Sequence, residues 1–483
     1  MPAGGGAFPD GGRRLRAFFL ADGPYAAAFL LLPIMVSLLK PLPPAPRLSA
    51  ERTDAEYKRL RLQVFIGIFI GYAAYYLVRK NFALAMPDIL QAYPQYSKAQ
   101  LGSAMTGLSI AYGFSKFLMG SVSDRSNPRY FLPLGLLLSS AVLFVFGFAK
   151  VIYLSLPLII GLQTLNGWFN GMGWAPCGKT MVHWFSARER GRAVSVWNVA
   201  HNVGGASAAT VALLGVMLFQ DWGAKFYFNA FIAAAIAIVA FFLLRDTPQS
   251  CGLPPVEEYK NDYPPNYSAE HERMLGFREI FFGHVLNNKG LWTIAIANGF
   301  VYFVRYGVVD WIPTYLQTAK GYSFQTSSTA WSLFEWSAVP GTILCGWISD
   351  KLFRSRRAPA TILFMGVTLL GLIAYGLNRH GPLWIDLAAL VTIGFFIYGP
   401  IMLIGLQALE MVPKKAAGTA AGFTGFFGYV FGSAFAGTGV GWIVDHWDWD
   451  GLMVSMCLCG VLSMVFSAFT LKTNALPLAS AAE

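Results

Sequence analysis

Long apolar runs separated by short polar stretches dominate the chain. A run of about 20 apolar residues is long enough to cross a bilayer as a helix. A lone strand cannot satisfy its backbone groups in hydrocarbon, so such runs must be helical. The pattern predicts an all-α membrane protein with twelve transmembrane helices, at 63–84, 99–121, 130–148, 153–176, 190–219, 224–245, 290–314, 325–348, 359–378, 382–408, 416–442 and 450–471.

The composition agrees with a membrane protein. Of the 483 residues, 55% are hydrophobic and 13% are charged, whereas soluble domains have about 25% charged residues. The net charge of +11 is placed unevenly along the chain. Short loops after even-numbered runs hold Arg125, Arg129, Arg188, Arg190, Arg192, Lys351, Arg354, Arg356, Arg357, Lys414 and Lys415, and those after odd-numbered runs hold Lys98, Lys150, Lys225, Lys320 and Arg379. Because basic loops stay in the cytoplasm, both termini are expected there, and the positive charge does not indicate nucleic-acid binding.

The chain contains an internal repeat. Asp124, in the sequence GSVSDR, and Asp350, in GWISDK, are 226 residues apart, and Arg79 and Arg305 have the same separation. A repeat of six helices keeps both copies in the same orientation, with the shared site near the middle of the membrane. The sequence therefore predicts two pseudo-symmetric six-helix bundles whose two arginines face one cavity.

This repeat divides the chain into domains. We expect a disordered cytoplasmic N-terminus at 1–60, with 1–34 preceding the natural start, and six-helix bundles at 61–246 and 290–472. A cytoplasmic linker is expected at 247–289 and a tail at 473–483. Within the linker, Met274, Phe277 and Phe281 have the spacing of a helix lying on the membrane surface, with a disordered tether as the alternative. The five cysteines form no CxxC pair, so no metal site, disulfide or cofactor is expected.

Arg79 and Arg305 are the strongest candidates for a binding site. Each follows a long apolar run, and an arginine at the centre of a bilayer costs about 2.5–3.5 kcal/mol on insertion scales. The alternative is that both side chains reach the membrane interface. Their repetition at matching depth favours a site, and two guanidinium forks are suited to a small dianion such as phosphate.

Other polar residues within the runs are weaker candidates. His201 can donate to the same anion or serve only in packing, and Lys116 can recruit substrate or reach the cytoplasmic interface. The acids Asp310 and Glu335 either neutralise Lys80 and Arg79 structurally or form ion pairs that hold the two bundles together until substrate binds. Tyrosines that can hydrogen-bond a polar ligand, or belong to packing, are Tyr72, Tyr76, Tyr302, Tyr398 and Tyr429. The loop residues Asp124, Arg125, Asp350 and Lys351 are expected to act in gating.

One motif is misleading. Residues 173–180, GWAPCGKT, fit the phosphate-loop pattern GxxxxGK[ST] letter for letter. That pattern binds nucleotides only between a strand and a helix of a βαβ unit. Here it lies at the end of an apolar run beside Pro176, so nucleotide binding is rejected.

Several segments resemble a known family. The loops around Asp124 and Asp350 resemble the signature of the major facilitator superfamily. The segments 75–82 (YYLVRKNF), 171–184 (GMGWAPCGKTMVHW) and 246–255 (DTPQSCGLPP) resemble the organophosphate:phosphate antiporters of that superfamily. The resemblance extends from about residue 35 past residue 471, and Met35 resembles the family's own start. It implies that phosphate is held by Arg79 and Arg305, with His201, Lys116 and the five tyrosines in the site and with Lys80, Asp310 and Glu335 in ion pairs between the bundles.

The function expected from this resemblance is secondary transport. The protein is expected to import glycerol 3-phosphate across the bacterial inner membrane in exchange for cytoplasmic inorganic phosphate, as a monomer, by alternating access. One alternative is a hexose 6-phosphate antiporter, and another is coupling to protons through Asp310 or Glu335. A third is a membrane sensor that binds the same ligand without transporting it. An enzyme is not expected, because the sequence shows no nucleophile and base or metal cluster.

Overall fold

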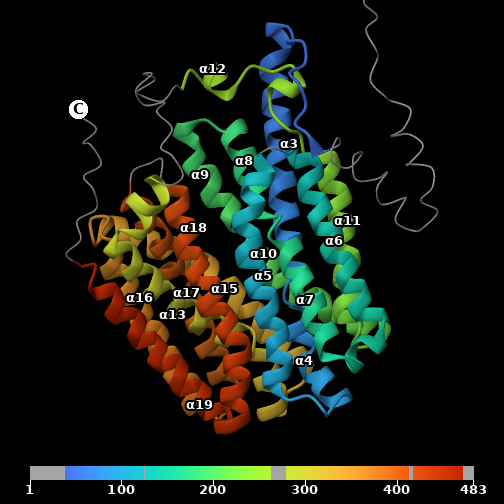
Figure 1. Cartoon of the computed structure of the whole chain (residues 1–483), viewed down its shortest axis with the longest axis vertical. Helices are drawn as coiled ribbons and strands as arrows, with labels where there is room; N and C mark the ends of the chain where they lie inside the picture. Colours follow the sequence, from blue (N-terminus) through green and yellow to red (C-terminus); the bar gives the residue numbers. More distant parts are fainter. Residues whose placement is uncertain (1–38, 125, 263–278, 413–416, 472–483) are drawn as a thin grey trace, which may run out of the picture.

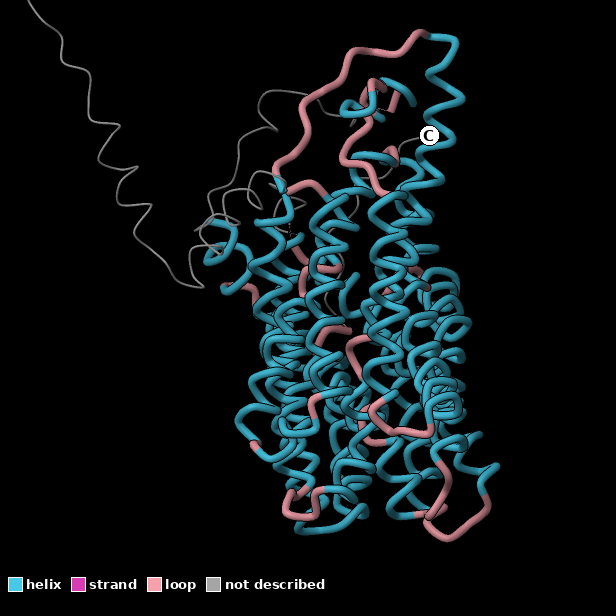
Figure 2. The backbone as a smooth tube through the Cα atoms, turned by 90° about the vertical axis from the view of Figure 1, so that its right-hand side faces the viewer, coloured by secondary structure: helices cyan, strands magenta, loops and turns pink. Residues whose placement is uncertain are grey.

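The protein is described from a computed structural model that covers residues 39–124, 126–262, 279–412 and 417–471. These residues form helices joined by short loops, and no strand occurs among them (Figure 2). The expected all-α fold is therefore confirmed. The predicted start at Met35, the tail at 473–483, Arg125, and Met274 and Phe277 of the predicted surface helix lie outside the described residues.

The first half of the chain contains nine α-helices and a 3₁₀ turn in its described part before the linker. The α-helices are α3 (Ala50–Leu77), α4 (Asn81–Ala92), α5 (Lys98–Asp124), α6 (Pro128–Phe148), α7 (Leu156–Asn170), α8 (Trp174–Trp184), α9 (Ala187–Asn198), α10 (Ala200–Phe219) and α11 (Ala224–Leu243), and the 3₁₀ turn is η1 (Lys150–Leu154). The described part of the linker contains η2 (Gln249–Cys251), α12 (Val256–Lys260) and η4 (Glu279–Leu286).

The second half contains the remaining helices. They are α13 (Lys289–Val309), α14 (Ile312–Thr314), η5 (Tyr315–Ala319), α15 (Phe324–Lys351), α16 (Arg357–Leu377), α17 (Leu383–Glu410), α18 (Ala417–Phe427), η7 (Gly428–Ser433) and α19 (Ala434–Ala468). Helix α19 contains one non-helical residue, Asp448, with φ 56°. This residue separates the two last predicted spans.

Membrane-spanning character is clear for most, though not all, of the predicted spans. Eight helical stretches of the described residues are long and apolar enough to cross a membrane. The predicted spans at 99–121, 153–176 and 325–348 are helical as well, in α5, in α7 with α8, and in α15. They carry more polar residues or are broken by a turn, so the count of twelve is not fully confirmed.

The first predicted span differs from its expected form at both ends. Helix α3 begins at Ala50, so residues 50–60, which we expected to be disordered, are helical. Their order comes from the linker: the ring of Tyr57 stacks on that of Tyr259 at 3.9 Å, and Arg47 forms a 2.8 Å ion pair with Glu258. At its other end the span breaks at residues 78–80 before continuing as α4.

The two halves lie side by side and meet along two seams at the end of the bundle opposite the linker (Figure 1). In one seam α5 packs on α19, where the Oγ atom of Thr106 donates to the carbonyl oxygen of Ala434 at 2.5 Å. A Cβ atom on Gly102 would lie 2.5 Å from the carbonyl oxygen of Gly437, so only glycine permits this approach.

In the other seam α10 packs on α15. The indole nitrogen of Trp331 donates to the carbonyl oxygen of Gly205 at 3.2 Å, and the hydroxyl of Ser332 donates to that of Ala206 at 3.0 Å. Closer to the linker α18 packs on α5, where the ring centres of Phe114 and Phe426 lie 5.6 Å apart. Most of the contacts between the halves lie at the opposite end of the molecule.

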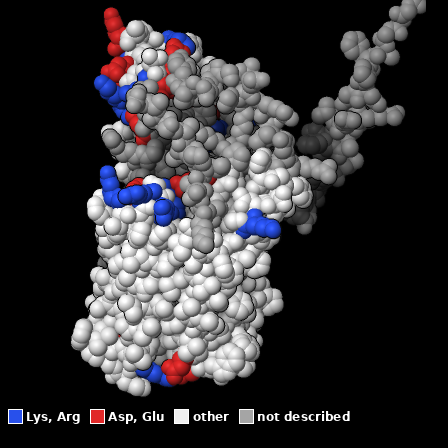
Figure 3. Space-filling view, turned by 90° about the vertical axis from the view of Figure 1, so that its left-hand side faces the viewer, with Lys and Arg blue, Asp and Glu red and all other residues white. Residues whose placement is uncertain are grey.

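Charged side chains on the surface are concentrated at the two ends of the molecule. On the face shown in Figure 3, lysine, arginine, aspartate and glutamate gather at the linker end and at the opposite end, and the band between them carries almost none. An uncharged band between two charged ends is what a bilayer requires of the surface that it contacts. Charged groups of the spans must therefore lie inside the bundle.

Candidate functional site

Arg79 lies in the break between α3 and α4. A broken helix in a membrane leaves backbone carbonyl groups that other side chains must satisfy. Here the amide of Asn166 on α7 donates to the carbonyl oxygen of Val78 at 2.9 Å, and the amide of Asn229 on α11 donates to that of Leu77 at 3.1 Å. The break is therefore built into the first half and fixes the position of Arg79.

The guanidinium group of Arg79 is held on one edge only. Its Nε donates to the Oδ1 of Asn170 at 3.1 Å, and its central carbon lies 4.3 Å from the ring centres of both Tyr76 and Tyr112. The residue is 4% exposed, and within the described part of the chain its Nη1 and Nη2 atoms have no hydrogen-bond partner. Contact with two aromatic faces offsets part of the cost of burying the charge, while two donors remain free.

Arg305 on α13 occupies a related environment in the second half. It is 6% exposed, its Nη2 donates to the hydroxyl of Tyr398 at 2.9 Å, and its guanidinium carbon lies 4.2 Å from that ring centre and 5.0 Å from that of Tyr306. The Tyr398 hydroxyl in turn lies 2.7 and 2.6 Å from the two carboxylate oxygens of Glu335, to which it donates. Arg305 is therefore linked to an acid through one tyrosine.

A series of ring contacts joins the two arginines through α10. The ring centre of Tyr76, which covers Arg79, lies 5.9 Å from that of His201, and His201 lies 5.7 Å from Tyr398, which covers Arg305. These residues come from α3, α10 and α17, so the series crosses from the first half to the second. The prediction that Arg79, Arg305, His201, Tyr76 and Tyr398 come together agrees with this geometry.

A second series joins the arginines through α5 and η7. The ring of Tyr112, on the other face of Arg79, lies 4.7 Å from that of Tyr429, and Tyr429 lies 6.2 Å from Tyr306, which contacts Arg305. The two series together form a closed circuit of six aromatic side chains with one arginine at each side. Both guanidinium groups therefore face a single aromatic enclosure.

His201 and Lys116 border this enclosure. The Nδ1 atom of His201 is hydrogen-bonded to the carbonyl oxygen of Asn198, which leaves Nε2 as the nitrogen available to a ligand. The ammonium of Lys116 lies 5.2 Å from the ring of Trp174 and 5.7 Å from that of Tyr429. Among the described residues no carboxylate lies within ion-pair distance of the Lys116 ammonium or the His201 ring, so both can contribute to attracting an anion.

The remaining predicted tyrosines support the enclosure. Tyr302 contacts Tyr429, with ring centres 5.2 Å apart. Tyr72 lies against Trp197 at 4.7 Å and against Tyr76 at 5.7 Å. Both are buried in the core, and their rings fix the tyrosines that contact the arginines.

The predicted ion pairs are formed only in part. The ammonium of Lys80 lies 2.8 Å from the carboxylate of Asp310, and this pair joins the first half to the second. The expectation that Glu335 belongs to a pair with Lys80 or Arg79 is wrong in this structure, because Glu335 is held by Tyr398 beside Arg305. Its place on α15 directs it to the arginine of its own half.

The loop residues predicted to act in gating lie away from the enclosure. Asp350 accepts from Arg357 at 2.5 Å, and Arg357 also donates to Glu410 at 2.7 Å, whereas Lys351 is exposed. Asp350 is thus held by Arg357 of α16, and the role of these loop residues in gating stays a prediction. The side chain of Asp124 is not among those described.

Sequence reasoning missed two tyrosines that contact the arginines and three amides on α7 that lie beside Arg79 and are not among the proposed substrate-binding residues. They are Tyr112, Tyr306, Gln163, Asn166 and Asn170. The three amides lie at positions 163, 166 and 170 of α7, which is the spacing of one helix face. An amide face on an apolar helix was the signal that could have indicated them.

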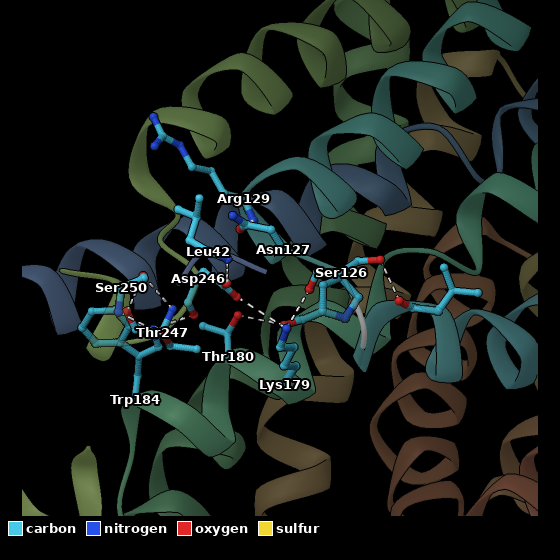
Figure 4. Close-up of polar contacts among 12 residues, drawn as sticks. Leu42, Ser126, Asn127, Arg129, Lys179, Thr180, Trp184, Asp246, Thr247 and Ser250 are labelled. Atoms are coloured by element: carbon cyan, nitrogen blue, oxygen red, sulfur yellow. Dashed lines mark hydrogen bonds and ion pairs between the residues drawn. The ribbon is translucent and has the colours of Figure 1, made fainter. Parts of the chain in front are cut away.

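Lys179, from the misleading phosphate-loop match, is a buried structural cation. Its ammonium donates to the carbonyl oxygen of Ser126 at 2.7 Å and lies 3.4 Å from the carboxylate of Asp246, which also accepts from the backbone nitrogen of Leu42 at 2.9 Å (Figure 4). The indole of Trp184 donates to the carbonyl oxygen of Asp246 at 3.3 Å. This cluster connects α8, the loop before α6, the end of the first half and residues 39–49.

Replacing Lys179 with methionine should therefore lower stability and leave the binding site unchanged. Removing one partner of a buried ion pair costs about 3–5 kcal/mol because the other charge stays uncompensated. Thermal unfolding of the purified protein measures the effect, and Lys351→Met, at an exposed position, serves as the control. An unfolding temperature equal to that of the control would show that the ion pair between Lys179 and Asp246 does not stabilise the fold.

Chemically, the enclosure is suited to a small anion with two negative charges. It offers two buried guanidinium groups, the free imidazole nitrogen, one ammonium and tyrosine hydroxyls. Within the described residues no group of three or more histidine, cysteine, aspartate or glutamate side chains is arranged to hold a metal ion.

Comparison with known proteins agrees with this architecture. Residues 68–437 match the model of the Major Facilitator Superfamily. A solved bacterial homologue of the human lysosomal transporter Spinster, in an inward-facing and unoccupied conformation, has a TM-score of 0.67 at 17% identity and covers 86% of this chain and 97% of its own. At that identity the likeness shows the fold alone.

Curated relatives are closer in sequence. The glycerol-3-phosphate transporter of Bacillus subtilis is 54% identical over 91% of this chain and 99% of its own length, and that of Haemophilus influenzae is 47% identical over 89% and 95%. A probable hexose phosphate transport protein of Chlamydia pneumoniae is 40% identical over 86% and 92%. The chain is a multi-pass membrane protein of a transporter family. It belongs to the major facilitator superfamily, and within it to the family of the glycerol-3-phosphate transporters.

Proposed function

We propose that the protein is an antiporter that imports glycerol 3-phosphate in exchange for inorganic phosphate. The observation that carries this proposal is the pair of buried guanidinium groups, one from each half, at opposite sides of one aromatic enclosure. Because Arg79 has free Nη donors, an anion can bind there without first displacing a protein partner. A phosphate group has acceptor oxygens for both forks at once.

The substrate-binding residues of this proposal are those that surround the two arginines. They are Arg79, Arg305, His201, Lys116, Tyr72, Tyr76, Tyr302, Tyr398 and Tyr429. Binding a dianion to both arginines draws the two halves together, since each half supplies one of them. A ligand shifts a conformational equilibrium only by its differential affinity for the two states, and here the state with both forks engaged is the one favoured.

Transport then follows from movement of one half against the other. The two halves pack on each other along both seams opposite the linker in this structure. We place the linker and both termini in the cytoplasm of a cell whose inner membrane holds the protein, because the loops on that side carry most of the basic residues. Each chain supplies both halves of the site, so the monomer is the working unit and no enzymatic step is needed.

Glycerol 3-phosphate is favoured over hexose 6-phosphate because the relatives named for it are the more similar ones. The test is counterflow of labelled phosphate in proteoliposomes, with glycerol 3-phosphate and glucose 6-phosphate as competitors. We expect glycerol 3-phosphate to compete at the lower concentration. Stronger competition by glucose 6-phosphate would assign the hexose phosphate, and binding without counterflow would indicate a sensor.

His201→Ala should flatten the pH dependence of substrate affinity between about pH 5 and 8. The free nitrogen of His201 can donate to the anion only when the ring is protonated, and an anion beside the ring favours the protonated form. Substrate binding should therefore be coupled to proton uptake by His201 in the parent protein, and this part of the pH dependence should be lost in the variant, whereas the second ionisation of the substrate, at about pH 6, affects both proteins alike. Binding of glycerol 3-phosphate across this range measures the effect, and an unchanged profile would assign His201 to packing.

A further inference from the structure

A small cavity lies between Arg79 and the ion pair that joins the halves. Its volume is about 10 Å³, which is close to the space that one water molecule needs. The polar residues that line it are Arg79, Lys80, Gln163 and Asp310, and its remaining walls are apolar. Its polar lining therefore comes from the α3–α4 break, from α7 and from the residue that follows α13, in both halves of the protein, and its apolar walls come from α4 and α5.

Three of these polar side chains have atoms without a hydrogen-bond partner in the described part of the chain. They are Oε1 of Gln163, both Nη atoms of Arg79, and Oδ1 of Asp310. The ammonium of Lys80 lies 2.8 Å from both carboxylate oxygens of Asp310 but donates its hydrogen bond to Oδ2. Gln163 is 1% exposed and Asp310 is 2% exposed, so bulk solvent does not serve these atoms.

The chemistry of these groups fits water better than an ion. The guanidinium supplies a donor, and the amide and carboxylate oxygens supply two acceptors, which a water molecule complements by accepting one hydrogen bond and donating two. Buried waters typically make about three such bonds to polar groups that lack a partner. A metal ion is disfavoured because the cations of Arg79 and Lys80 line the same cavity.

We propose that this cavity binds one water molecule, which accepts from Arg79 and donates to Gln163 and Asp310. The water connects the arginine of the anion site to the Lys80–Asp310 pair between the halves. An anion that engages the Nη donors of Arg79 withdraws the donor from the water and so weakens its support of Asp310. This consequence rests on the proposed function, whereas the water site itself does not.

The direct test is an experimental structure of the substrate-free full-length protein in lipid nanodiscs, at a resolution that shows buried waters. We expect density within about 2.7–3.2 Å of Oε1 of Gln163 and of Oδ1 of Asp310. The density should be lost in Gln163→Met, which keeps the length of the side chain and removes the acceptor. A parental map that shows other buried waters but none here would overturn the proposal.

The coupling has a separate test. Pulsed dipolar distances between spin labels on α5 and α19 report how far phosphate shifts the equilibrium between the conformations of the two halves. We expect the phosphate-induced change in the equilibrium constant between these conformations to be about tenfold smaller in Gln163→Met than in the parent. Phosphate affinity should change less than about threefold. Gln407→Met is the matched control, because Gln407 is a buried glutamine whose amide bonds to Thr470 within the second half.

The two tests separate this inference from the proposed function. A parental shift in Gln163→Met would overturn the coupling role of the water. If the parent protein itself gives no phosphate response, the proposed function fails, while the density in the substrate-free map still decides the water site. The map of the parent protein needs no variant. The water site can therefore be refuted even if Gln163→Met folds poorly.

Discussion

Arg79→Lys should lower the efficiency of phosphate exchange at least about 100-fold. Lysine is a point charge and cannot present the planar fork of Arg79, whose two Nη donors have no partner among the described residues. Each hydrogen bond to a charged group contributes about 1.5–3 kcal/mol, and every 1.4 kcal/mol corresponds to about a factor of ten. The loss of two such bonds therefore exceeds a hundredfold. Exchange of labelled phosphate in proteoliposomes measures it.

Arg305→Lys should have an effect of similar size, with an additional consequence for its neighbours. Its Nη2 bonds the hydroxyl of Tyr398, so lysine would also leave Tyr398 and Glu335 without that cation. Arg129→Lys, at the linker end of the bundle, is the control and should exchange phosphate at the parental rate. If either site variant does so as well, with normal expression and unfolding temperature, the assignment of the anion site is wrong.

Asp310→Asn should abolish exchange and lower the stability of the protein. It leaves the ammonium of Lys80 buried without a counter-charge, and removing one partner of a buried ion pair costs about 3–5 kcal/mol. The double variant Lys80→Met/Asp310→Leu removes both charges and should regain most of the unfolding temperature. Its exchange rate should stay at least about tenfold below that of the parent, because the ion pair that joins the halves is gone.

A matched control separates the effect of the Lys80–Asp310 contact between the halves on exchange from its effect on stability. Lys320 and Asp386 form an ion pair within the second half, with the ammonium 2.6 Å from the carboxylate. Lys320→Met/Asp386→Leu should change the unfolding temperature of the protein. The exchange rate per folded molecule should stay near that of the parent. Parental exchange in the Lys80/Asp310 double variant would show that this pair serves folding only.

The two arginines could be identified from the sequence because the cost of charge in a membrane is large and local. Lys80 and Asp310 were found in the same way, and their pairing between the halves is confirmed. Tyr112 and Tyr306 could not be separated from the other tyrosines, since a ring can pack anywhere in an apolar core. The amides of α7 indicate a polar helix face only when positions 163, 166 and 170 are taken together, since a single asparagine or glutamine gives no sign of its partner.

For Glu335 the partner expected from its charge differs from the partner that the structure gives it. Its charge and depth agreed with a partner across the interface, but its position on α15 places it beside Tyr398 and Arg305. The helical start of α3 at Ala50 has a similar origin, because contacts with Tyr259 and Glu258 of the linker order a segment whose local composition predicted disorder.

The sequence alone showed that the chain is a helical membrane protein, that it contains an internal repeat with a spacing of 226 residues, and that each copy of the repeat carries an arginine after a long apolar run. These features follow from hydropathy, spacing and charge, which act locally and are independent of how the helices pack. The tertiary structure alone decided which edges of the two arginines are occupied, which acid pairs with which cation, and where the halves touch. Those outcomes depend on contacts between helices far apart in the chain, and no local pattern encodes their geometry.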